Sequence, residues 1–202
     1  NADQDILKGK TALRFFLAVV GVIFFLFTVT FLSRTQFPDF MALSGEPWQP
    51  FTNPIQRWYN TGALLAGDIA LQWAKLSARA NHLNGALAGI IIGIFFSLSF
   101  LIGQLLVWNQ LYDLGYVLTS NPANSYFYLF TAVHGVHILG GLAALSKVTF
   151  QFIRKNSLSQ LRAGISLCTS YCHFLFVICL LLFALLTSSP ETYKTIAQLC
   201  GF

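Results

Sequence analysis

A mostly apolar run spans residues 85–108 and reads GALAGIIIGIFFSLSFLIGQLLVW. It contains no charged residue, and a helix over these residues would be about 36 Å long, enough to cross the roughly 30 Å hydrocarbon core of a bilayer. Gly85, Gly89 and Gly93 are spaced four residues apart, which predicts a groove where a second helix backbone approaches closely. A hinge is the alternative interpretation of these glycines. The run therefore predicts a membrane-spanning helix with one small-residue face.

The whole chain has the composition of a membrane protein. Of its 202 residues, 55% are hydrophobic and 9% charged, with a mean hydropathy of +0.64, whereas soluble domains carry about 25% charge. This composition excludes a disordered chain, a disulfide-stapled secreted module and an ordinary cytosolic enzyme. The net charge of +5 lacks the basic cluster that a nucleic-acid partner would need. We expect one all-α, polytopic membrane bundle over residues 1–202, with five spans at 13–32, 57–78, 85–108, 124–149 and 165–187.

The basic residues predict the direction of the bundle. Nine of the 12 Lys and Arg residues fall at the N-terminus or in the second and fourth connections, and three fall on the other side. Because Lys and Arg are enriched in cytoplasmic loops, we expect a cytoplasmic N-terminus and an outside C-terminus. The larger group is Lys8, Lys10, Arg14, Lys75, Arg79, Lys147, Arg154, Lys155 and Arg162, and the smaller group is Arg34, Arg57 and Lys194.

A few polar side chains lie inside the predicted spans, where an ionisable group costs a few kcal/mol and normally faces protein or water. Haem or metal ligation is one interpretation, since His is the commonest metal ligand. Hydrogen bonds across helices are the other, and we favour them because a membrane haem needs His pairs that face each other. Of these residues, His134 and His137 share a helix face. The set is Asp68, Gln104, His134, His137 and His173.

Three cysteines, Cys168, Cys172 and Cys179, lie on one stripe of the last span. A copper site is conceivable here, because thiolates favour Cu(I) and His173 is adjacent in sequence. On a helix, however, His173 points about 100° away from Cys172, and a free Cys is an ordinary buried residue. We expect core packing. No nucleophile–base pair, phosphate loop or metal-binding spacing occurs in the sequence, so we expect no catalytic centre in this chain.

The stretch NSYFYLFTAVHGVHILGG at 124–141 resembles the signature of subunit III of the haem–copper oxidases (the cytochrome c oxidase type). That signature has an aromatic pair, a Thr, His-Gly-x-His and a Gly pair. Other parts of the chain are similar to the family in the same order, from about residue 10 onward, and match its short five-span form. They are Asn60-Thr61 in the second span, Gly103-Gln104 and Trp108 in the third, and His173-Phe174 in the last.

The chain departs from the family pattern where many members carry acidic residues. It has Val20, Val107 and Phe176 at those positions, so no role tied to those acids carries over. We hypothesise that Asp68, at a depth similar to that of Val20, partly replaces the missing acid as a polar anchor bonded to a His or to backbone donors. The alternatives are a small water pocket or a protonated carboxyl, since burial disfavours the charged form.

The resemblance implies a non-redox subunit of a bacterial haem–copper terminal oxidase in the inner membrane. The whole oxidase would reduce oxygen and transport protons. In that family, subunit III packs against the catalytic subunit, binds phospholipid between its helices and supports stable turnover. Haem and copper would belong to the partner subunits I and II, with no cofactor in this chain, and a respiratory supercomplex is left open. We expect lipid head groups near Arg14 and Arg79, because basic residues at the cytoplasmic rim attract anionic lipids.

Three other classes of protein remain open from the sequence. One is the subunit III-like accessory protein of a nitric oxide reductase, which shares the fold. Another is a haem-carrying membrane anchor, which visible absorption would reveal. The third is a small transporter, which should show internal repeats and broken helices; the sequence shows neither.

Overall fold

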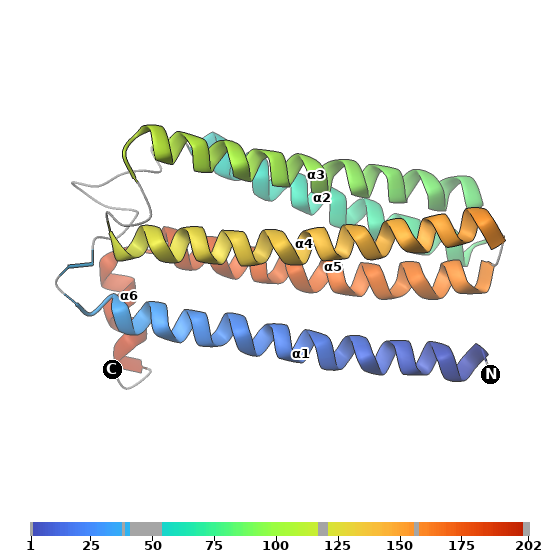
Figure 1. The fold of residues 1–202 in the computed structure, drawn as a ribbon, viewed down its shortest axis with the longest axis horizontal. Coiled ribbons are helices and arrows are strands. Elements are labelled where there is room, and N and C mark those ends of the chain that lie inside the picture. The colour runs from blue at the N-terminus through green and yellow to red at the C-terminus, as the bar shows by residue number, and fades with distance from the viewer. Residues whose placement is uncertain (1, 38, 41–53, 117–120, 156–157, 200–202) are drawn as a thin grey trace.

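The computed structural model describes residues 2–37, 39–40, 54–116, 121–155 and 158–199. The five long helices run side by side and alternate in direction, and a short sixth helix turns across one end (Figure 1). We call the end that holds Arg34 and Asp113 the Arg34 end, and the opposite one, where α2 finishes, the Arg79 end. The expected all-α polytopic bundle is confirmed. The described helices are α1 (Ala2–Arg34), α2 (Pro54–Arg79), α3 (Leu83–Asp113), α4 (Pro122–Lys155), α5 (Leu158–Thr187) and α6 (Pro190–Leu199).

Each predicted span lies inside one of the long helices, and four of these helices are long and apolar enough to cross a membrane. Those stretches are Leu7–Arg34, Leu83–Asp113, Pro122–Arg154 and Ser159–Thr187. The second predicted span, in α2, does not reach the same hydropathy, because polar residues interrupt its apolar sequence. The helices extend past the predicted spans since helical hydrogen bonding does not stop at the edge of the hydrocarbon.

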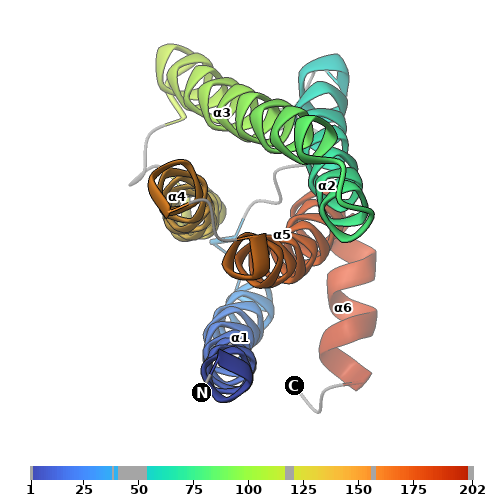
Figure 2. The same ribbon diagram turned by 90° about the vertical axis from the view of Figure 1, so that its right-hand side faces the viewer.

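Helix α5 is the centre of the bundle. It contacts α1, α2 and α4 and lies between α1 and α2 in the end-on view (Figure 2). In the most apolar stretch of α5, 39% of the residues are buried within the chain, against 22% in α1. Helix α1 packs on α4, α5 and α6 and, within the described residues, makes no close backbone contact with α2. The outer surface is largely apolar, as lipid or partner helices require, and includes Phe15, Phe25, Ile91, Phe95 and Ile102.

The glycine face of α3 packs directly on α2, as the spacing predicted. A Cβ built on Gly89 would lie 2.8 Å from the Ala70 carbonyl oxygen and 2.8 Å from the Ala74 Cβ. A Cβ built on Gly93 would lie 2.8 Å from the Leu71 side chain. The glycines thus let the two backbones approach closely, and α3 continues unbroken through them rather than hinging.

Helix α6 is absent from the sequence predictions because it is short and carries no long apolar run. Its start does carry local signals: Pro190 occupies the first turn, and the Ser189 hydroxyl accepts a hydrogen bond from the Thr192 amide at 3.4 Å. Tyr193 is buried against α1 and donates its hydroxyl to the Leu185 carbonyl at 2.6 Å. Burial raises the pKa of this phenol above its usual value. Together with Ile196, which packs against the same apolar cluster, Tyr193 holds α6 on the bundle.

Candidate functional site

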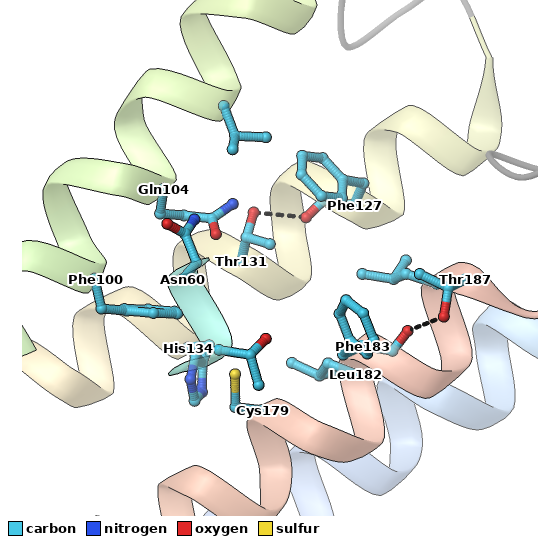
Figure 3. Close-up of a pocket in the computed structure, with 13 residues that line it drawn as sticks. Asn60, Phe100, Gln104, Phe127, Thr131, His134, Cys179, Leu182, Phe183 and Thr187 are labelled. Atoms are coloured by element: carbon cyan, nitrogen blue, oxygen red, sulfur yellow. Dashed lines mark hydrogen bonds between the residues drawn. The ribbon is translucent and has the colours of Figure 1, made fainter. Parts of the chain in front are cut away.

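A cavity of about 80 Å³ lies between α2, α3, α4 and α5, toward the Arg34 end (Figure 3). Its polar lining includes Asn60 and Thr61 from α2, Gln104 from α3 and His134 from α4. These residues belong to separate motifs in the sequence, and folding brings them to one place. The rest of the lining is mostly apolar and includes Phe100, Val107, Phe127, Cys179, Leu182 and Phe183.

Two side chains at this cavity are deeply buried with polar atoms unpaired. Asn60 is 5% exposed and His134 is 3% exposed. The Asn60 Oδ1 and both ring nitrogens of His134 have no hydrogen-bond partner in the described part of the chain. Leaving a buried polar group unsatisfied costs about 1–3 kcal/mol, and native interiors rarely contain such groups. The cavity is therefore the place where the chain's own hydrogen bonding is incomplete.

The surrounding residues hold these polar groups in place. Gly103 leaves room for Asn60, because a Cβ at Gly103 would overlap the Asn60 carbonyl oxygen. The His134 ring lies edge-to-face against Phe24 and Phe100, with ring centres 6.3 and 5.9 Å away. In the Gly103-Gln104 motif, the glycine therefore has a steric role: it leaves space on α3 for the Asn60 side chain of α2.

Thr131 and Trp108 connect α3 to α4 beside the cavity. The Trp108 ring nitrogen donates to the Thr131 hydroxyl at 3.0 Å. That hydroxyl in turn donates to the Phe127 carbonyl at 2.7 Å. This chain of bonds keeps the two helices in register at the mouth of the cavity.

A second polar cluster, nearer the middle of the bundle, joins α2 to α5. His173 Nδ1 and Asp68 Oδ2 are 2.5 Å apart, so Asp68 has the His partner that the sequence predicted. Asp68 Oδ1 is buried without a partner in the described chain, and an adjoining cavity of about 20 Å³ has room for about one water. Gln72 Oε1 is also buried and unpaired, although the sequence analysis did not place it among the site residues.

A direct replacement of the acid that is missing at Val20 would require Asp68 to lie beside Val20. It does not. Val20 is 1% exposed and packs in an apolar cluster with Phe24 and Phe130. Because α5 separates α1 from α2 (Figure 2), the similar depth of the two residues does not make them neighbours. Any anchoring by Asp68 acts between α2 and α5 instead.

His137 differs from His134 although both lie on α4. Its Nδ1 lies 2.7 Å from the Val133 carbonyl oxygen on the same helix, and its own carbonyl accepts a hydrogen bond from the Tyr171 hydroxyl at 2.9 Å. His137 thus makes local and interhelical structural contacts and does not line the larger cavity.

The cysteine stripe packs as expected. Cys168 and Cys179 lie in apolar core clusters and Cys172 packs half-buried beside the first of them. All three are free thiols. Over the described residues, no three His, Cys, Asp or Glu side chains come together in a way that could hold a metal ion.

The predicted lipid-binding residues Arg14 and Arg79 are exposed on α1 and at the last turn of α2. An open groove on α4 contains two further cations, Lys147 and Arg154, and the Arg154 guanidinium lies over the Phe150 ring at 5.7 Å. These positions give the Arg79 end an exposed basic surface. The Arg57 and Lys155 side chains, both counted in the orientation argument, lie outside the described residues.

Sequence analysis also missed a basic clamp at this end. Arg162 Nε donates to the Ala78 carbonyl at 2.9 Å, and the guanidinium also donates to the Asn81 side chain. Asn81 has a φ of 64°, a left-handed conformation that Asn tolerates better than most residues. Asn81, in the short link between the predicted spans 57–78 and 85–108, is the local signal that could have indicated this turn.

The comparison with known families supports the resemblance of the motifs. The family model for cytochrome c oxidase subunit III matches residues 5–188, from the first turns of α1 to the end of α5. The chain belongs to the cytochrome c oxidase subunit III family. The family and the four apolar helices make it a membrane protein, and the family implies the respiratory chain. The polar lining of the cavity thus includes motif residues of a subunit III protein from three different helices.

Individual relatives of this subunit III chain agree with the family match. Cytochrome c oxidase subunit 3 of Thermostichus vulcanus is 26% identical over 174 residues, which is 83% of this chain and 85% of that protein. The probable cytochrome c oxidase subunit 3 of Mycobacterium leprae (strain TN) is 30% identical over 167 residues, 80% of this chain and 77% of that protein. Against cytochrome c oxidase subunit 3 of Tragelaphus oryx, 27% identical over 137 residues, the match covers 68% of this chain but only 50% of the relative.

Proposed function

We propose that this chain is the non-redox subunit III of a bacterial haem–copper terminal oxidase. The observation that carries this proposal is the family match over residues 5–188. Oxygen reduction, proton transport and the haem and copper centres would belong to subunits I and II, and this chain would contribute no cofactor. Its role would be to pack against the catalytic subunit and to keep it stable during turnover.

The proposal includes five membrane spans, with α2 as the additional one. A helix of 26 residues is about 39 Å long, enough to cross the hydrocarbon core. Its polar residues do not argue against this, because Asn60 is buried and Asp68 pairs with His173. On the positive-inside rule, the Arg79 end would face the cytoplasm and the Arg34 end the outside.

Phospholipid would bind at the exposed basic surface of the Arg79 end. Arg14 and Arg79 remain the proposed head-group partners, and Lys147 and Arg154 on α4 add a second basic site. Each Lys or Arg near an anionic membrane surface contributes roughly 1 kcal/mol to such binding. The acyl chains of the lipid would lie between the helices of this chain.

Purification of the tagged full chain from native membranes in a mild detergent tests the proposal. We expect it to co-purify with a haem–copper subunit I and with oxygen-reductase activity. Co-purification with nitric oxide reductase subunits and nitric oxide consumption would replace the proposal by the accessory-protein alternative. Stoichiometric haem on the separated chain would replace it by the membrane-anchor alternative.

Orientation is tested with single cysteines in a variant that lacks the native ones. Lys147→Cys should react with a membrane-impermeant thiol reagent only from the cytoplasmic side, and Lys194→Cys only from the outside. Labelling of both positions from the same side would show that the number of spans between them is not odd. Labelling of Lys147→Cys from the outside and of Lys194→Cys from the cytoplasm would contradict the proposed orientation of the bundle.

A further inference from the structure

The cavity at Asn60 and His134 has the polar groups of a binding site. His134 offers two ring nitrogens without partners and Asn60 offers one such oxygen. Among the residues that the structure describes, no Lys, Arg, Asp or Glu lines the cavity. A charged ligand, such as a phosphate head group, would therefore be buried among apolar side chains without a counter-charge, which is unfavourable.

The hydrogen-bonding capacities of these groups restrict the ligand further. A neutral imidazole has one donor nitrogen and one acceptor nitrogen, and an amide oxygen is only an acceptor. The occupant must therefore both donate and accept hydrogen bonds. A lipid acyl chain can do neither, and among the described residues a metal ion would find only His134 and Cys179 as lining His or Cys ligands. Water meets both requirements.

The size of the cavity agrees with this choice. About 80 Å³ exceeds the roughly 10–15 Å³ that one water needs, so several waters fit. Steric features preserve the space: Gly103 leaves room for the Asn60 amide, and Phe24 and Phe100 border the His134 ring.

We propose that this cavity is a hydrated site, in which a small cluster of ordered water molecules completes the hydrogen bonding of Asn60 and His134. The cluster joins α2 to α4, two helices that make no close backbone contact with each other within the described residues. The waters thus replace direct side-chain contacts at the centre of four helices. This inference does not depend on which oxidase or reductase the chain assembles with.

A cryo-electron microscopy map at about 2 Å of the complete complex in lipid nanodiscs tests the proposal. We expect separate rounded peaks within hydrogen-bond distance of Asn60 Oδ1 and of a His134 ring nitrogen. A continuous elongated density would identify an acyl chain and overturn the proposal. A map that resolves waters elsewhere but shows none in this cavity would overturn it as well.

Variants give a second measurement with a matched control. Leu182 lines the cavity, whereas its neighbour Leu181 is exposed. Leu182→Phe should displace the waters and lower the melting temperature of the complex by about 2–4 °C, the shift for a modest loss of stability in a chain of this size. Leu181→Phe should change it little. His134→Leu distinguishes a hydrated cavity from a dry one. If water forms hydrogen bonds with the ring nitrogens, loss of the ring should lower the melting temperature. A rise in melting temperature would show that the buried nitrogens are unpaired and would contradict the proposal.

Discussion

Gly89 tests the packing of α2 on α3 most sharply, because the chain leaves no room for a methyl group there. In Gly89→Ala, the new Cβ would lie 2.8 Å from the Ala70 carbonyl oxygen, 2.8 Å from the Ala74 Cβ and 2.9 Å from the Ala74 amide nitrogen. Two of these atoms are backbone, so relief requires the helices to separate. Overpacking of this kind costs typically about 1–3 kcal/mol, and the contacts place Gly89 toward the upper end. The higher helix propensity of Ala returns about 1 kcal/mol.

The expected net loss is about 1–2 kcal/mol, or about 3–6 °C in melting temperature for a chain of this size. Thermal unfolding of the detergent-solubilised complex, followed by Trp fluorescence, measures it. Gly140→Ala is the matched control, since nothing lies within 4 Å of its added Cβ; it should leave the melting temperature unchanged or raise it. Gly93→Ala should fall between the two, because its close neighbour is the movable Leu71 side chain. Equal melting temperatures for Gly89→Ala and Gly140→Ala would refute the close α2–α3 packing.

Other predictions concern the polar ties between helices. Asp68→Leu leaves His173 without its partner and should shorten the turnover lifetime of the complex, whereas Asp68→Asn keeps most of the hydrogen bonding and should lose less; unchanged lifetime and thermal stability in Asp68→Leu would remove the anchor hypothesis. Arg162→Leu should accelerate amide exchange or proteolysis at the α2–α3 turn, and protection equal to wild type would show that the clamp contributes nothing. Tyr193→Phe should loosen α6 by about 1 kcal/mol. Because burial raises the pKa of the Tyr193 phenol, its contribution should be complete below a pH of about 10 and decline as the pH rises through the raised value. A fluorophore at Lys194→Cys should report release of α6 at alkaline pH in the otherwise wild-type chain, and an equal pH response in Tyr193→Phe would exclude the phenol as its cause.

The helices were predictable because their signals are local. Long apolar runs indicated where the long helices lie, and the spacing of Gly89 and Gly93 predicted a close helix contact. The sequence could not say that α2 was the partner, because helix packing depends on side chains distant along the chain. Helix α6 was missed for another reason: ten residues with no apolar run carry only weak start signals.

The cavity could be predicted only in part. Asn60, Gln104 and His134 were each singled out in the sequence, but nothing in their spacing indicates that they line one cavity. Their convergence depends on the rotation of three helices about their axes, which tertiary packing sets. The comparison of Val20 with Asp68 failed on the same ground, since equal depth in the membrane does not specify which helices are neighbours.

Selective removal of this chain from the purified oxidase tests the proposed non-redox role most directly. The measurement is the haem absorption spectrum and the turnover lifetime of the complex before removal, after removal and after adding the chain back. The account predicts that all the haem stays with the remaining subunits, that the initial rate of oxygen reduction is largely kept, and that activity is lost sooner until the chain is restored. Haem absorption that leaves with the released chain, or a turnover lifetime that does not change, would contradict it.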